Sequence, residues 1–252
     1  MRCLLVSARE ILVITWITTY LLTTKGRLYH RRQAVVYAEW TQTESRQVRS
    51  ALHGHTTQLR AVSSLKSVSV ADVDLPVADS MRVLGVTLDR RLTFDNHTSA
   101  VARSCNYHAR AIRHIRYLLT LDLAQTLACS LILSRIDYCN SVLHGAPSST
   151  IQKLQRIQNN AARIVLQAPR RSDVNSLLPT LHWLPVEQRI NYKLAMLTFK
   201  TQQTSSPQYL NQHISLRTSA RNTRSSSVPL LCVSFRRTSF ARRSFSMAAP
   251  LT

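Results

Sequence analysis

The stretch Asp95 to Leu119, DNHTSAVARSCNYHARAIRHIRYLL, carries the clearest periodic pattern in the chain. Apolar and half-polar residues recur in it at steps of four and three: Val101, Cys105, His108, Ile112, Ile115 and Leu119. That spacing places them on one face of a helix. Arg103 and Arg110 lie nearly opposite this face, with Arg113 between. We therefore predict a helix that Asp95 caps, with one side buried and arginine on the other.

Three more helices follow from similar patterns. The segment from Thr120 to Leu143 is apolar nearly all round, which is typical of the central helix of a bundle. Ser148 is predicted to cap a third helix that is apolar on one side, whereas the other side carries Gln152, Lys153, Arg156, Asn160 and Arg163. Pro185 is predicted to begin a fourth helix, which runs to about Lys200.

The helical region is flanked by segments of different character. Val83 to Leu88, VLGVTL, favours a buried strand or hairpin arm. We expect a leader over 1–58, short strands over 59–94, a helical domain over 95–201 and a basic Ser/Arg-rich extension over 202–252 with extended or loosely docked structure. The expected fold is thus mainly α: a helical bundle with a short β element before it and an irregular basic tail.

The charge of the chain is extreme. Its 33 Lys and Arg residues against 12 Asp and Glu residues leave a formal net charge of +21. Such an imbalance indicates a polyanionic partner, RNA or DNA, although a solvated basic tail and ordinary soluble helix faces are the alternatives. The residues expected to touch phosphate are Arg103, Arg110, Arg113, Lys153, Arg156, Arg163, Arg170 and Arg171.

The amino-terminal segment leaves the compartment open. Ile11 to Leu22, ILVITWITTYLL, fits a buried strand or helix, a signal peptide or membrane anchor, or a leader from a misjoined reading frame. Five cysteines without a CxxC pair indicate neither a disulfide framework nor a zinc site. We expect an intracellular protein, in the nucleus or the cytoplasm.

The stretch SRIDYCNS, Ser134 to Ser141, joins an acid, a phenol and a thiol, with His144 shortly after. In a helix Asp137 and Cys139 would point about 200° apart, and no oxyanion donor or Gly-rich elbow accompanies them. We interpret the stretch as the end of a helix, with Ile136 and Cys139 inward and Asp137 at the rim. No catalytic residue and no metal ligand is predicted.

Six stretches follow one another along the chain in this order: VLGVTLDRRLTF, RSCNYHARAIRHIR, SRIDYCNSVLHGAP, KLQRIQNNAARIVL, LHWLPVEQRINYK and RRSFSMAAPLT. This ordered set resembles the carboxy-terminal part of the reverse transcriptases of non-LTR retrotransposons, the LINE elements of the CR1 and jockey type. The match runs from about Gln58 to Thr252. The resemblance implies the end of a polymerase palm, with VLGVTLD near the primer grip, and a thumb that holds the template-primer duplex.

Polymerase chemistry needs paired carboxylates that hold two metal ions. In the family they come from an early palm aspartate and a Tyr-Ala-Asp-Asp turn. The nearest string here is YAEWTQ, with Glu39 and Trp40 in place of the two aspartates, and it is either a relic of the turn or a coincidence. We expect a catalytically incomplete chain without a cofactor, since Mg²⁺ would be needed only by an intact family polymerase.

The expected activity is at most sequence-independent binding of RNA or DNA. Three alternatives remain open. The chain could supply the thumb of an RNA-directed DNA polymerase that an upstream palm completes, it could be a secreted or membrane-anchored basic protein, or it could be the unexpressed product of a decayed element. The sequence makes no prediction about oligomeric state.

Overall fold

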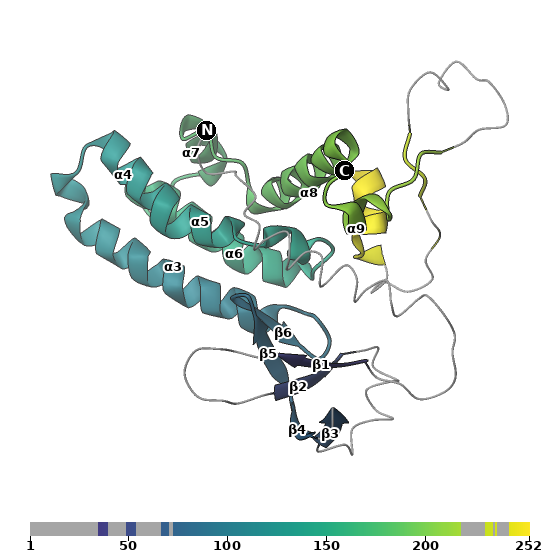
Figure 1. Ribbon diagram of the computed structural model, residues 1–252. Coiled ribbons are helices and arrows are strands. Elements are labelled where there is room, and N and C mark those ends of the chain that lie inside the picture. The colour runs from purple at the N-terminus through teal and green to yellow at the C-terminus, as the bar shows by residue number, and fades with distance from the viewer. Residues whose placement is uncertain are drawn as a thin grey trace.

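The computed structural model describes residues 35–39, 49–53, 67–70, 73–217, 230–233, 235 and 242–252. The apolar run from Ile11 to Leu22 lies outside these ranges. The described chain is mainly helical, with a short two-stranded antiparallel sheet directly before the helices (Figure 1). The predicted fold class is therefore confirmed. No helix in the described ranges is long and apolar enough to cross a membrane.

Four strands form one small sheet: β1 (Val35–Glu39), β2 (Arg49–His53), β3 (Ser67–Val70) and β4 (Val73–Ala78). Their order is β1-β2-β4-β3, with β2 parallel to β4 and the two outer pairs antiparallel. Strands from both sides of residue 58 therefore pair in a single sheet, which lies below the helices in Figure 1.

The run from Val83 to Leu88, predicted as one buried strand or hairpin arm, instead contains the turn of a hairpin. Its arms are β5 (Ser80–Val83) and β6 (Val86–Asp89), which pair antiparallel. The two residues between them, Leu84 and Gly85, have φ angles of 47° and 87°. Two-residue hairpin turns with positive φ at both positions match the twist of the strands they join, and glycine takes such an angle readily. Val86 and Leu88 are fully buried, so one face of the hairpin belongs to the core.

The first helix, α3 (Asp95–Ile115), continues into a 3₁₀ turn, η1 (Arg116–Leu118). Its predicted faces are confirmed over most of the helix, because Cys105 and Ile112 are buried whereas Arg103 and Arg110 are exposed. Ile115, predicted on the buried face, is exposed. The start of α3 is not capped by Asp95. The cap position belongs to Phe94, and the loop before the helix is held by Asp89, whose carboxylate accepts the backbone N–H groups of Thr93 (3.0 Å) and Phe94 (2.8 Å).

The central segment is shorter and less regular than predicted. It consists of α4 (Leu121–Ala128), the π turn η2 (Cys129–Leu133), α5 (Ser134–Asp137) and, after a break, the 3₁₀ turn η3 (Asn140–Leu143). The prediction of one helix to Leu143 was wrong because Tyr138 is extended and Cys139 has φ 53°. At this break the Tyr138 hydroxyl donates a hydrogen bond to Leu84 O, 2.6 Å away on the hairpin turn.

The remaining helices are α6 (Ser148–Val165), α7 (Val174–Thr180), α8 (Val186–Thr204) and α9 (Gln208–Asn211). Two of their starts differ from prediction, because Pro147 and Pro185 take the cap positions. The short helix α7 was not predicted. α6 packs against α3, α4, α7 and α8 and so forms the centre of the bundle, a place predicted for the segment from Thr120 to Leu143.

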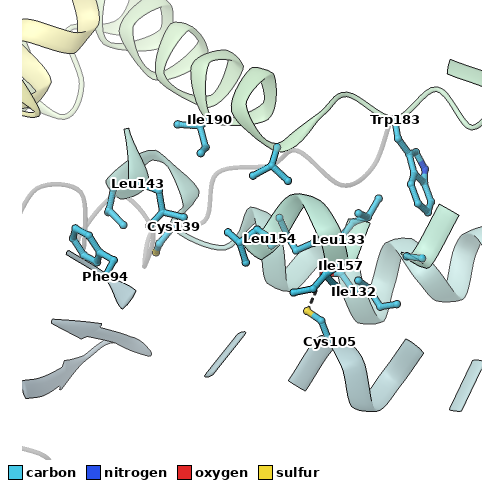
Figure 2. Packing of buried hydrophobic residues seen from close by; sticks show 14 of the residues in the cluster. Phe94, Cys105, Ile132, Leu133, Cys139, Leu143, Leu154, Ile157, Trp183 and Ile190 are labelled. Carbon is cyan, nitrogen blue, oxygen red and sulfur yellow. Dashed lines mark hydrogen bonds between the residues drawn. The ribbon is translucent and has the colours of Figure 1, made fainter. Parts of the chain in front are cut away.

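The core joins these helices to the hairpin. Figure 2 shows Cys105 of α3 beside Ile132, Leu133, Leu154 and Ile157, with a dashed line from the cysteine sulfur. That Sγ–H group donates to Ile132 O at 3.7 Å. Burial raises the pKa of Cys105 to about 11, so this thiol is a packing group rather than a nucleophile.

The carboxy-terminal residues are more ordered than expected. α11 (Phe245–Ala248) and the 3₁₀ turn η4 (Ala249–Leu251) are packed against the bundle, and every residue from Ser244 to Ala249 is buried. The expectation of extended or loosely docked structure was therefore wrong here. The Ser/Arg-rich composition concealed a short apolar stretch, and one arginine, Arg243, anchors it to the bundle.

Candidate nucleic-acid interface

The predicted arginine-bearing faces lie on two neighbouring helices. α3 and α6 run side by side in the same direction, because contacts join Asp95 to Lys153 near their first turns and Arg116 to Val165 near their ends. The ends of α3 and α4 that meet lie away from the strands (Figure 1). Arg113 and Arg116 at the end of α3 and Arg163 at the end of α6 therefore lie at the same end of this helix pair.

A half-open pocket of about 700 Å³ lies at the carboxy-terminal ends of α3 and α6. It brings together three of the predicted site residues, Arg113, Arg163 and Arg170. Arg116 and Tyr117, which were not predicted, also line it. The volume is within the usual range for small-molecule sites, roughly 300 to 1,000 Å³.

Arg116 holds the two helix ends in place. Its guanidinium donates to Val165 O from Nε (2.9 Å) and Nη2 (2.6 Å), and to Leu119 O from Nη1 (2.8 Å). Carbonyls at a helix end have no partner within the helix, so a cation bound there stabilises the end. Because the acceptors are neutral, the positive charge of Arg116 remains at the edge of the pocket.

Arg113 and Arg163 are also positioned by neutral groups. Arg113 Nη2 donates to Asn160 Oδ1 at 2.7 Å, and Arg163 Nη2 donates to Ser172 O at 3.1 Å. The Nε atom of Arg163 is buried and finds no hydrogen-bond partner among the described residues. Each of the two guanidinium groups is thus oriented by a neutral acceptor and keeps its positive charge.

The charge of the pocket follows from the ion pairs. Those found within the described ranges are Arg90–Asp79, Lys153–Asp95 and Arg189–Asp137, and none involves a pocket arginine. The two helix ends contribute about −0.5 charge each. Against the four guanidinium groups of the lining, this leaves about +3. The arrangement suits an anion with more than one negative charge, or a chain of them.

The other predicted residues lie outside the pocket. Arg103 and Arg110 on α3, Arg156 on α6 and Arg171 after it are exposed. Lys153 contacts Asp95, with 3.0 Å between Nζ and Oδ1, and Thr150 donates to the same carboxylate oxygen at 3.2 Å. Lys153, with help from Thr150, lowers the pKa of Asp95. The charge of Lys153 is therefore balanced within the protein.

Sequence reasoning missed Arg116 and Tyr117 for identifiable reasons. Arg116 falls near the apolar edge of the α3 stripe, where a long side chain is ordinarily taken for a helix-rim residue. Tyr117 belongs to the 3₁₀ turn that follows α3, so the helical period no longer predicts its direction. The sequence feature that could have indicated this site is the position of Tyr117, directly after arginines that recur every three residues.

A second pocket, of about 550 Å³, lies between the hairpin, α3 and α5. Arg82, His97 and Arg135 line it. The Thr87 N–H approaches His97 Nδ1 at 3.5 Å, and burial, followed by the charge of Arg82, lowers the pKa of His97 to about 4. His97 is therefore neutral at pH 7 and acts as an acceptor.

The SRIDYCNS stretch packs only partly as predicted. Ile136 and Cys139 are buried as expected. Asp137 was expected at the rim and is instead buried, where it pairs with Arg189 of α8. The reason is that a carboxylate can be buried when a guanidinium fork satisfies both its oxygens.

The YAEWTQ string is described only in part. Tyr37, Ala38 and Glu39 lie in β1, where Glu39 is paired in register with Arg49. Trp40 lies outside the described residues. Within the described ranges no three His, Cys, Asp or Glu side chains come together to hold a metal ion.

Comparisons with protein-family models, curated proteins and solved structures found no match for this chain. Its function must therefore be inferred from its own residues and contacts.

Proposed function

We propose that this protein binds the phosphate backbone of RNA or DNA without reading its sequence, through the arginine pocket of α3 and α6. The observation that carries the proposal is the gathering of Arg113, Arg116, Arg163 and Arg170 around one pocket, with no carboxylate paired to them in the described ranges. A guanidinium group can donate two parallel hydrogen bonds to one phosphate. Contacts to the phosphate backbone of a nucleic acid carry no information about its base sequence.

The exposed arginines extend this surface. Arg103 and Arg110 continue the basic face of α3, and Arg156 that of α6. A phosphate chain leaving the pocket would meet them along the two parallel helices. The overall charge of +21 would draw a polyanion toward the protein from a distance at low salt.

We further propose that the chain corresponds to the end of the palm and the thumb of a LINE-type reverse transcriptase. Contacts between the stretches that carry the resemblance support this. Asp137 of SRIDYCNSVLHGAP pairs with Arg189 of LHWLPVEQRINYK. Gln158 of KLQRIQNNAARIVL donates to Leu184 O at 2.7 Å, and Gln155 accepts the Val186 N–H at 2.8 Å. The stretches therefore belong to one folding unit.

The proposal includes no polymerase activity for this chain by itself. The string nearest to the family's acidic turn, YAEWTQ, is either a relic of that turn or a coincidence, and it offers Glu39 and Trp40 in place of two aspartates. A single carboxylate does not hold two metal ions. Primer extension by the purified chain would contradict this part of the proposal.

The binding proposal is tested by fluorescence anisotropy with a labelled RNA-DNA duplex at 50 mM salt. In the same buffer raised to 0.1 M salt, the triple variant Arg113→Ala, Arg163→Ala, Arg170→Ala should bind at least about a hundredfold more weakly than the unmodified protein, as expected for three lost phosphate contacts. The control is Arg91→Ala, an exposed arginine before the first turn of α3 and about 30 Å from the pocket along that helix. No binding by the unmodified protein at low salt would refute the proposal.

A further inference from the structure

An exposed aromatic ring stands at the mouth of the arginine pocket. Tyr117 lines the pocket, yet 78% of its surface is exposed to solvent. It lies in η1, between the end of α3 and the start of α4, where Arg116 on one side is fixed to the carbonyls of Val165 and Leu119. The hydrogen bonds of Arg116 therefore fix the backbone next to Tyr117, while the Tyr117 ring itself does not pack into the core.

The pocket beside the Tyr117 ring is lined by guanidinium and amide groups. Arg113, Arg163 and Arg170 supply positive charge around the same pocket, and the side chains of Asn160 and Gln167 line it as well. An aromatic face beside a basic groove is how proteins bind single-stranded nucleic acid, because each base stacks on the ring while the groove follows the phosphates. A duplex hides the faces of its bases, so a ring in a pocket can reach only an unpaired one.

We propose that the pocket takes a single-stranded segment, with one unpaired base stacked on Tyr117 and the flanking phosphates on Arg113, Arg163 and Arg170. This inference rests on the proposed binding of nucleic acid and adds a preference to it: an unpaired strand or end binds more tightly than a fully paired duplex. The amides of Asn160 and Gln167 tolerate any base, since an amide offers both a donor and an acceptor.

An anionic membrane is the other partner that an exposed ring beside arginines could meet, because Leu118, Leu121 and Leu123 are also exposed nearby. The concave form of the site favours the nucleic acid. Tyr117 opens onto a volume of about 700 Å³ with amide groups in its wall. A bilayer instead calls for a continuous apolar face that sinks between the lipids.

The test measures the affinity of the full chain for three labelled oligonucleotides by fluorescence anisotropy: a 12-nucleotide oligothymidine, a blunt 12-base-pair duplex, and that duplex with a single-stranded 3′ extension. We expect the single strand and the extended duplex to bind more tightly than the blunt duplex. Tyr117→Ala should weaken binding of the single strand about tenfold, the effect of losing one stacked base. Tyr117→Phe should keep it, because the ring remains.

The matched control is Tyr107→Ala. Tyr107 is 71% exposed on α3, lies edge-on to His108 and is not among the pocket residues. Its loss should leave all three affinities unchanged, and thermal unfolding of each variant checks that the fold is kept.

The possible failures are distinguishable. If the blunt duplex binds as tightly as the single strand and Tyr117→Ala changes neither, whereas the triple arginine variant weakens both, the stacking inference is wrong and the backbone-binding proposal stands. If no oligonucleotide binds at low salt, both are wrong. Binding to vesicles with anionic lipid that depends on Tyr117, without oligonucleotide binding, would assign the site to a membrane and overturn the inference.

Discussion

Asp137 and Arg189, 52 residues apart in the chain, form a buried ion pair in which one guanidinium donates to both oxygens of one carboxylate. Arg189 Nε lies 2.8 Å from Asp137 Oδ1, and Nη2 contacts Oδ2. The side chains are 6% and 11% exposed for Asp137 and Arg189, respectively. The pair joins the end of α5 to the first turn of α8, which fixes the chain at the break after α5.

Removing one partner of this pair should be costly. Asp137→Ala leaves the Arg189 guanidinium buried without its carboxylate, and we expect a loss of about 3–5 kcal/mol in the free energy of unfolding. Arg189→Ala should cost a similar amount. Urea denaturation followed by circular dichroism measures both.

The double variant of Asp137 and Arg189 should lose clearly less unfolding free energy than the two single variants lose together. The double variant leaves no lone buried charge, whereas each single variant does. Glu187→Ala is the control, since Glu187 is exposed in the first turn of α8 and should change stability by less than about 0.5 kcal/mol. Strict additivity of the two single losses would show that the pair is not coupled.

Arg243 should hold the carboxy-terminal helix on the bundle. Its Nη1 donates to Leu92 O at 2.8 Å, its Nε donates to His144 O at 3.3 Å, and its guanidinium lies over the Phe94 ring, 5.4 Å from the centroid. Arg243→Ala removes these contacts, at a cost of about 2 kcal/mol. Hydrogen exchange measured by mass spectrometry should then show faster exchange over 244–249. Arg242→Ala, its exposed neighbour, should not change the exchange rate.

Gly145→Ala should loosen the same segment, although Gly145 lies far from it in the chain. Gly145 has φ 67°, and a Cβ atom there would stand 2.9 Å from Arg243 Cγ. The left-handed backbone alone costs a residue with a side chain roughly 1–2 kcal/mol. Faster exchange over 244–249 in this variant is the expected result. Unchanged exchange there would mean that Arg243 adjusts without leaving its place.

Stability should fall in mild acid because of His97. Its pKa is lowered from the ordinary 6.5 to about 4 in the folded protein, first by burial and then by Arg82. Above pH 6.5 both folded and unfolded forms are neutral, so the full stability is present. As the pH falls from 6.5 toward 4, only the unfolded state takes up the proton, and stability drops by on the order of 3 kcal/mol.

Urea denaturation at pH 7, 6, 5 and 4 measures this loss. His97→Asn keeps an acceptor for the Thr87 N–H and does not titrate, so its stability should depend less on pH. Part of the slope should remain, because burial also lowers the pKa of His144 and of His213. An unchanged slope in His97→Asn would assign the acid sensitivity to other groups.

The salt dependence of binding should give the number of phosphates that the protein contacts. The logarithm of the binding constant should fall linearly with the logarithm of salt concentration. The triple variant of Arg113, Arg163 and Arg170 should reduce that slope by about 2 to 3, as expected for three released counterions. Lys153→Ala should leave the slope nearly unchanged, since the charge of Lys153 is balanced by Asp95. Equal slopes for the unmodified protein and the triple variant would exclude the pocket as the binding site.

The parts of the fold that could be predicted are those that depend on near neighbours. The faces of α3 and α6 follow from residues three and four apart, and the hairpin follows from a short apolar run with a glycine. The break at Tyr138 and Cys139 could not be predicted in this way. It coincides with a hydrogen bond to Leu84, 54 residues away, and local periodicity carries no information about such a partner.

The candidate site also has a part that local sequence predicts and a part that depends on distant contacts. The sequence by itself determined that the protein is strongly basic, that it is mainly helical, and that arginines lie opposite the apolar faces of two helices, because composition and helical period are local properties. Only the tertiary structure decided which charges are balanced within the protein. Lys153 pairs with Asp95, whereas Arg113 and Arg163 meet neutral acceptors and share a pocket, and that distinction depends on how α3 lies against α6.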